Sequence, residues 1–210
     1  LLRMKRMMPI GKNKMSGYYS IKANSENGSR KIAFEHQNHA FKEMSKIFTF
    51  PISSYKGTMV VLPTGGGKTF TAVRWLCNNV LSKNIKILWL AQSTYLLDQA
   101  FKTFSEEIKF IPDRELVNVR IVSGNETHAN VGTVSLSDDV IICTTQTAIL
   151  NYKSTSLDLY GEEQKKPLGK YIDKYKNGEL LIVIDEAHHT PAFGCRTMLT
   201  DISENMNSNL

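Results

Sequence analysis

Short, almost continuous apolar runs recur along this chain of 210 residues, and segments with helical spacing separate them. The runs are TMVVL, ILWLA, VIIC and LLIVI. An unbroken apolar run is typical of a strand that is covered on both faces, as in a parallel sheet. Because parallel strands need crossover connections, strands that alternate with helices predict right-handed βαβ units and a doubly wound α/β layer.

The runs and spacings give a set of predicted elements. The predicted strands are Met59–Leu62, Ile85–Ala91, Val117–Ser123, Val140–Thr144 and Leu180–Asp185. The predicted helices are Lys68–Leu81, Thr94–Ile108, Gln146–Asn151, Leu168–Tyr175 and Ala192–Asn205, after an earlier helix that starts near Phe34 and is ended by Pro51. The polar stretches Gly124–Asp138 and Lys153–Pro167 lack apolar periodicity, so they are predicted to run over the surface.

Positive charge is concentrated at the start of the chain. Residues 1–31 hold eight Lys or Arg against one acid, whereas the remaining residues hold 18 basic and 19 acidic side chains. We predict a basic, irregular segment over residues 1–30, either an arm that binds phosphate backbones or a solvated leader, followed by one domain over residues 31–210. Three distant cysteines without a CxxC pair favour a reducing, cytoplasmic compartment, and no apolar stretch is long enough to span a membrane.

A glycine-rich turn follows the first predicted strand. LPTGGGKT occupies Leu62–Thr69 and a helix is predicted after it, which is the strand–turn–helix context that a P-loop requires. Glycines let backbone N–H groups approach a phosphate, the lysine reaches the terminal phosphates, and the threonine hydroxyl can ligate Mg²⁺. The usual first glycine is replaced by Leu62, which disfavours most other P-loop families, and an incidental Gly-rich turn is the alternative.

Two adjacent acids, Asp185 and Glu186, end the last apolar run, LLIVI. The carboxyl ends of strands in open α/β sheets are where ligands bind. There Asp185 would hold Mg²⁺ and Glu186 would polarise the attacking water. The alternative is that the pair caps the helix predicted beyond Pro191.

PTGGGKT at Pro63–Thr69 and DEAHH at Asp185–His189 resemble motifs I and II of the superfamily 2 helicases and translocases, DEAH-type, within the restriction-enzyme and phage-defence helicase group. ILWLAQSTYLLDQ at Ile87–Gln99 resembles motif Ia, and TTQTAIL at Thr144–Leu150 resembles motif Ib. The resemblance covers residues 30–210 and implies the first RecA-like P-loop NTPase domain, a mostly parallel sheet with helices on both faces.

The resemblance also implies residue roles and partners. Gln37 would read adenine, Thr64 to Thr69 would bind ATP, Thr69 and Asp185 would hold Mg²⁺, and His188 would couple the nucleotide state to movement. The catalytic residues would be Lys68, Asp185 and Glu186. The implied nucleic-acid contacts are Gln92, Ser93, Thr144 and Thr145, with DNA favoured over RNA, although Gln92 and Thr94 depart from the usual motif Ia.

The family has a further strand motif and a second RecA-like domain with arginine fingers, and the chain stops at NSNL, about where that next strand would begin. We therefore expect part of a longer protein that hydrolyses ATP weakly by itself, with a nuclease or defence-complex subunit as a further partner. The alternatives are a nucleotide switch or scaffold without motor activity, an RNA-directed helicase or sensor, and an unrelated P-loop ATPase.

Overall fold

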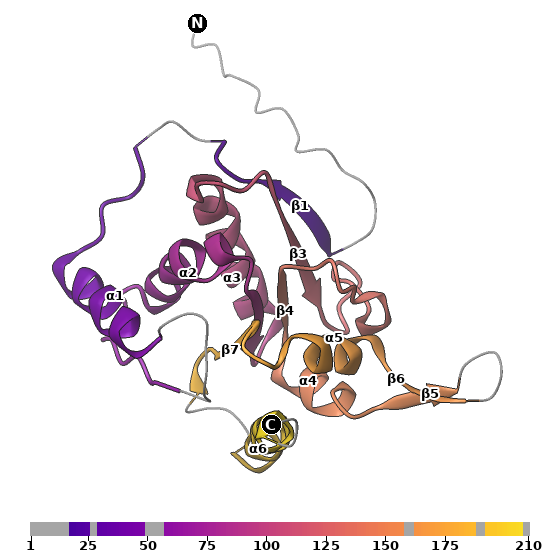
Figure 1. Cartoon of the computed structure of the whole chain (residues 1–210). Coiled ribbons are helices and arrows are strands. Elements are labelled where there is room, and N and C mark those ends of the chain that lie inside the picture. Colours follow the sequence, from indigo (N-terminus) through magenta and orange to yellow (C-terminus); the bar gives the residue numbers. More distant parts are fainter. Residues whose placement is uncertain (1–16, 26–28, 49–56, 158–161, 188–191, 208–210) are drawn as a thin grey trace, which may run out of the picture.

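The computed structural model describes residues 17–25, 29–48, 57–157, 162–187 and 192–207. Strands and helices alternate along most of this part of the chain (Figure 1). The strands are β1 Tyr18–Lys22, β2 Lys86–Ala91, β3 Leu116–Val122, β4 Val140–Thr144, β5 Thr155–Leu157, β6 Glu163–Lys165 and β7 Leu180–Ile184. The helices are α1 Glu35–Ile47, α2 Lys68–Asn79, α3 Thr94–Glu107, α4 Thr145–Asn151, α5 Pro167–Tyr175 and α6 Ala192–Asn207, with short 3-10 turns at Leu81–Lys83, Ile108–Phe110 and Val131–Thr133.

Five strands form one sheet in the order β1-β3-β4-β2-β7. Strands β3, β4, β2 and β7 are parallel to their neighbours, and β1 is antiparallel to β3 at the edge. Parallel pairing places the carboxyl ends of β2, β4 and β7 at one edge, so the loops that follow them lie together. The predicted fold class, a mostly parallel RecA-like α/β sheet, is confirmed.

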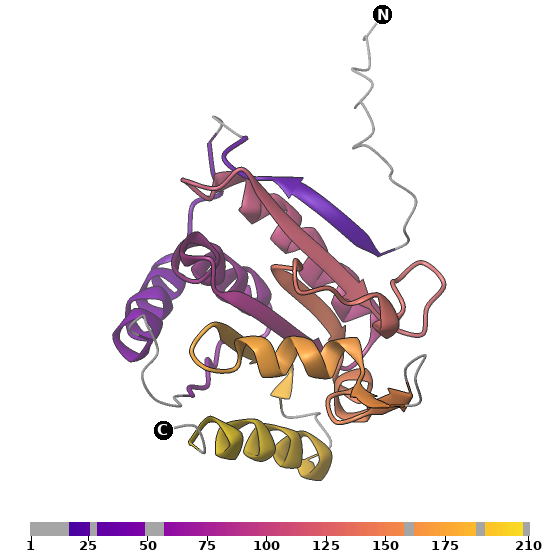
Figure 2. The ribbon, with the colours of Figure 1, turned by 45° about the vertical axis from the view of Figure 1, so that its right-hand side comes forward.

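Helices cover both faces of this sheet, which explains the continuous apolar runs. Trp89 of β2 faces a core with residues of α1, α2 and α3, whereas its neighbours Leu88 and Leu90 face a second core with residues of α4, α5 and α6. In Figure 2, α5 (orange) lies across the front of the sheet and α6 (yellow) lies below α5. Residues of β2 and β4 are therefore apolar along nearly the whole strand, whichever face they point to.

The predicted strand Met59–Leu62 is wrong. Within the described ranges the segment Gly57–Pro63 has no ladder partner, and β7 pairs only with β2. Val60 is partly buried against the core that contains Trp89, while Met59 and Val61 are 76% and 79% exposed. The local sequence favours an extended backbone, but a strand also needs a neighbour with which to exchange hydrogen bonds.

The prediction that residues 1–30 are irregular is also wrong for β1. Tyr18–Lys22 pairs with Leu116–Arg120. The ring of Tyr19 packs against the ring of Phe101, with the two ring centroids 4.3 Å apart. Nor is Gly124–Asp138 all surface, because Ala129, Val134 and Asp138 are buried. Lys153–Pro167 holds a two-stranded hairpin, β5–β6, with exposed residues.

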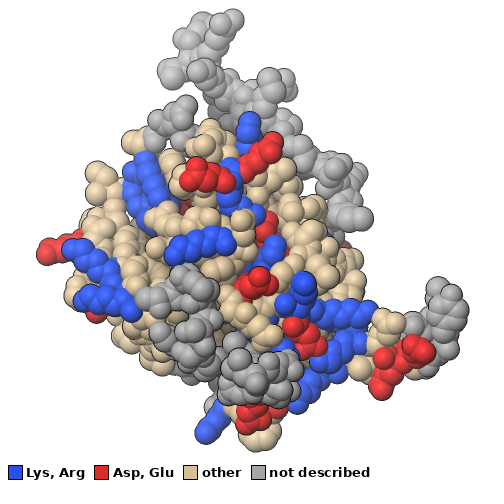
Figure 3. Space-filling model, viewed as in Figure 1, with Lys and Arg blue, Asp and Glu red and all other residues tan. Residues whose placement is uncertain are grey.

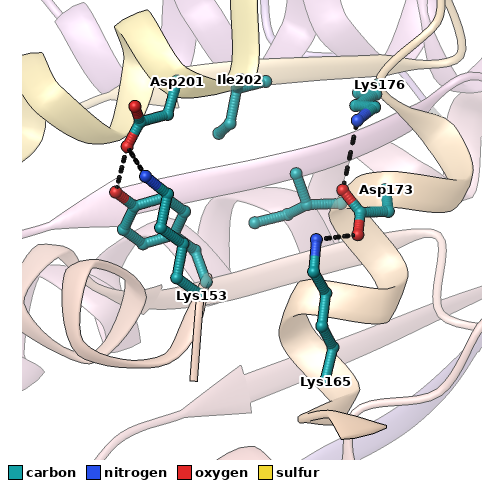
Figure 4. Close-up of a pocket in the computed structure, with 8 residues that line it drawn as sticks. Lys153, Lys165, Asp173, Lys176, Asp201 and Ile202 are labelled. Carbon is teal, nitrogen blue, oxygen red and sulfur yellow. Dashed lines mark hydrogen bonds and ion pairs between the residues drawn. The ribbon is translucent and has the colours of Figure 1, made fainter. Parts of the chain in front are cut away.

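Ion pairs and hydrogen bonds tie α6 to the end of α4 around a shallow pocket (Figure 4). The Tyr152 hydroxyl donates to Asp201 at 2.6 Å, and Lys153 pairs with the same carboxylate. These two partners lower the pKa of Asp201. Across the pocket Asp173 pairs with Lys165 and Lys176. The lysines that line the pocket therefore already have carboxylate partners. We interpret the pocket as part of the packing interface between α4, α5 and α6, not as a ligand site. None of the helices in the described ranges is long and apolar enough to cross a bilayer.

Candidate active site

The predicted P-loop forms a tight turn directly before α2. The Gly66 N–H donates to the Pro63 carbonyl at 2.9 Å, and a Cβ atom on Gly66 would lie only 2.9 Å from that oxygen. Gly65 and Gly67 have φ angles of +79° and +76°, which L side chains rarely adopt. The turn delivers Lys68 to the first position of α2, where N–H groups of the first turn lack helical partners.

The acidic pair lies at the carboxyl end of β7. The Asp185 N–H donates to the Leu90 carbonyl at 2.8 Å, at the last pair of the β2–β7 ladder, Leu90 with Ile184. The Asp185 carboxylate accepts a hydrogen bond from the Glu186 N–H at 3.0 Å, and Glu186 has a left-handed backbone with φ +49°. A left-handed non-glycine residue is uncommon, and such strain is concentrated at functional sites.

The fold brings these two motifs together. The Lys68 Nζ atom lies 3.2 Å from Glu186 Oε1, with the two side chains 37% and 26% exposed. The pKa of Asp185 is raised, first by burial and then by the negative charge of Glu186. The site therefore has one lysine and two adjacent carboxylates. This excess of negative charge favours the binding of a further cation.

These residues fit a magnesium nucleotide. A Cβ atom on Gly65 would meet nothing within 4 Å, so the loop is open on that side, and the free N–H groups at the start of α2 attract anions. Magnesium in phosphate sites is held by one or two carboxylates together with the phosphates and waters. Asp185, with the Thr69 hydroxyl on α2, matches that donor set.

Gln37 lies beside the P-loop, on the first turn of α1. Its side-chain oxygen accepts from the Phe34 N–H at 3.0 Å, and its Nε2 donates to the Gly66 carbonyl at 3.1 Å. The side chain is 4% exposed. Nε2 of the neighbouring His36 also lies 3.1 Å from the Gly66 carbonyl. Contact of Gln37 with adenine stays a prediction. The contact between His36 and the loop was not predicted, although the position of His36 next to Gln37 in the sequence could have indicated it.

The predicted nucleic-acid residues follow β2 and β4 at the same sheet edge. Gln92 is exposed and Ser93 caps α3, with its hydroxyl accepting from the Leu96 N–H at 3.4 Å. Thr144 caps α4, accepting from the Thr147 N–H at 3.2 Å. Thr145 is 2% exposed and its hydroxyl donates to the Ala91 carbonyl at 3.4 Å. His188 lies outside the described residues.

Replacing Asp185 with Asn is expected to stabilise the protein without metal by about 0.5–2 kcal/mol, the common size of a stabilising substitution. Asn can still accept from the Glu186 N–H but carries no charge beside it. Because the folded pKa is raised, the charged carboxylate is unfavourable above it, and the difference should shrink as pH falls and Asp185 becomes protonated.

Thermal melts in EDTA across pH measure this difference. With saturating Mg²⁺ and nucleotide the order should reverse, because the wild type, which keeps the carboxylate for Mg²⁺, gains more stability from the ligand than the variant does. A variant that melts at or below the wild-type temperature in EDTA at neutral pH would contradict the interpretation of Asp185 as an uncompensated charge.

Comparisons with known proteins agree with this geometry. The chain aligns with a viral protein named "Putative helicase 22", from Sulfolobus islandicus filamentous virus (isolate Iceland/Hveragerdi), with 25% identity over 171 residues. That alignment covers 80% of this chain and 26% of the viral protein, so the chain spans about a quarter of that relative. A family model described as "Type III restriction enzyme, res subunit" matches residues 30–209, which include both motifs. The chain therefore belongs to the family of the type III restriction enzyme res subunit.

Proposed function

We propose that the chain is the ATP-binding motor domain of a helicase or translocase, which couples ATP hydrolysis to movement on nucleic acid. The observation that carries this proposal is the contact between Lys68, on the P-loop, and Glu186, at the end of β7. Family membership and the name of the viral relative support the same function.

Each residue of the site has a role in this proposal. Backbone N–H groups of Gly65, Gly67 and the first turn of α2 would hold the phosphates, Gly66 closes the turn through its hydrogen bond to Pro63, and Lys68 neutralises the phosphate charge. Thr69 and Asp185 would hold Mg²⁺, which supplies charge neutralisation at the transferred phosphoryl group. Glu186 orients the attacking water and accepts its proton.

The nucleic acid would lie across the loops that follow β2 and β4. Gln92, Ser93 and Thr144 would contact phosphates there, and a contact by the buried Thr145 would be through its backbone. Basic and acidic side chains are interspersed over the face of the molecule that Figure 3 shows. We favour DNA over RNA, and a nuclease or defence-complex subunit as partner, from the family alone.

A second RecA-like domain of the same protein would complete the nucleotide site. It would supply arginine fingers, which are worth about 10³–10⁵ in rate in related phosphoryl-transfer enzymes. His188, next to the acids, would transmit the nucleotide state to that domain. By itself the chain should bind nucleotide and hydrolyse it slowly.

Steady-state ATPase activity of the full-length parent tests the function. We expect stimulation by single-stranded or duplex DNA and little by single-stranded RNA, with Lys68→Ala as the inactive blank. Nucleotide binding without stimulation by any polymer would instead support a nucleotide switch or scaffold, and stimulation by RNA alone would support an RNA-directed helicase. Fast, DNA-stimulated turnover by this chain alone would contradict the need for a second domain.

A further inference from the structure

The P-loop is held from outside by the first turn of α1. Gln37 Nε2 and His36 Nε2 both lie 3.1 Å from a single acceptor, the Gly66 carbonyl oxygen. A Cβ atom on Gly67 would lie 2.6 Å from Gln37 Nε2, so the amide of Gln37 also lies against the next residue of the loop. Two side chains from another element thus determine where one loop carbonyl points.

The direction of this carbonyl fixes a phosphate-binding group. The Gly66 carbonyl and the Gly67 N–H belong to the same planar trans peptide, so they point in opposite directions. When α1 holds the carbonyl, the Gly67 N–H points away from α1. Gly65 and Gly67, on either side of Gly66, have positive φ, and glycine offers little resistance to rotation, so an external contact adds to the selection of one orientation.

The other end of the Gln37 amide is used to fix its own position. Gln37 occupies the third position of α1, and its side-chain oxygen accepts from the Phe34 N–H at 3.0 Å. The ring of Phe34 stacks on the ring of His36, with centroids 5.8 Å apart and an angle of 13° between the planes. These contacts hold the start of α1 in one conformation, in which the Nε2 atoms of Gln37 and His36 both lie beside the Gly66 carbonyl oxygen.

We propose that Gln37, assisted by His36, is a positioning residue that orients the Gly66–Gly67 peptide for phosphate binding, whichever base the nucleotide carries. The inference rests on the proposed function, since it assumes that phosphates bind at Gly65–Lys68. The inference goes beyond the proposed function. If Gln37 reads the base, its replacement should weaken the binding of adenine nucleotides only, whereas if it orients the peptide, its replacement should weaken every ligand with a triphosphate equally.

The most informative variant is Gln37→Glu. Glutamate at this helix position keeps an oxygen for the Phe34 N–H, so the start of α1 is preserved. It cannot donate to the Gly66 carbonyl and places a negative charge beside it. We expect the dissociation constants of ATP, GTP and inorganic triphosphate, each with Mg²⁺, to rise about tenfold or more and by similar factors.

His36→Ala removes the second contact and is expected to weaken all three ligands by about two- to fivefold. His39→Ala, an exposed histidine on the same helix, is the matched control and should change none of them. Equal melting temperatures for the wild type and Gln37→Glu would show that the change in binding does not come from lost folding.

Calorimetric titrations of the protein with the three ligands decide the matter. A parallel loss for ATP, GTP and triphosphate supports the positioning role. A loss confined to ATP overturns it in favour of base reading, and unchanged affinities overturn it outright. If the wild type binds none of the ligands better than Lys68→Ala does, the proposed function fails and the positioning role fails with it.

Discussion

Glu186→Gln is expected to lower ATP hydrolysis about 10²–10⁴-fold, the usual contribution of a general base, while nucleotide binding becomes tighter. Glutamine has the same shape, so the left-handed turn and the hydrogen bond from its N–H to Asp185 can persist. It cannot take a proton from water. It also removes the negative charge that lies 3.2 Å from Lys68 and competes with phosphates for that lysine.

The gain in affinity should be modest because this ion pair is partly exposed. Pairs of this kind are worth about 0.2–1 kcal/mol, which corresponds to a dissociation constant for ATP about 1.5- to 5-fold lower. Single-turnover hydrolysis with saturating nucleic acid and equilibrium binding of ATP measure the two effects separately. Lys68→Ala is the opposite control, because it should lose binding and hydrolysis together.

If hydrolysis by Glu186→Gln stays within about threefold of the wild type, Glu186 is not the base. If hydrolysis falls but binding weakens, Lys68 and Glu186 do not compete as the apo geometry indicates. The combination of slow chemistry and tighter binding therefore distinguishes a base that is paired with the P-loop lysine at rest from an acid with a purely structural role.

The parts of this site that were predicted from the sequence are those with local chemical signatures. Consecutive glycines before Lys68, and acids directly after LLIVI, determine their own backbone and position once the strands are parallel. The four parallel strands β2, β3, β4 and β7 were predicted because their sequences are mostly apolar, as burial in a sheet covered on both faces requires. The turn that gives Glu186 a positive φ has no such signature, and it was not predicted.

Partnerships between distant segments explain the rest. Met59–Leu62 has the composition of a strand but no partner strand among the described residues, whereas the short β1 is a strand because β3 lies beside it. The contact between Gln37 and Gly66 depends on where α1 packs, which local sequence does not determine. The same is true of buried charges: Glu107 is an ordinary helix residue in the sequence, yet in the fold it is 2% exposed and bound to two arginines.

Glu107→Ala is expected to reduce the free energy of unfolding by about 3–5 kcal/mol, because it leaves a buried charge without its partner. The Glu107 carboxylate accepts from Arg74 at 3.0 and 2.9 Å and from Arg30 at 2.9 and 2.6 Å. Arg74 is 5% exposed and also donates to the Lys31 carbonyl at 2.6 Å. Domains of ordinary stability have about 5–15 kcal/mol in total, so a large fraction would be lost.

Glu106→Ala is the matched control, one residue away on the same helix. Its carboxylate pairs at 2.7 Å with Lys31, but the two side chains are 42% and 67% exposed, so the loss should stay below about 1 kcal/mol. Urea unfolding of both variants measures the difference, and similar midpoints would show that burial does not strengthen the Glu107 cluster. Because Arg30 and Lys31 lead directly into α1, Glu107→Ala should also weaken binding of all triphosphates under conditions where it remains folded, since α1 would then hold the P-loop less firmly.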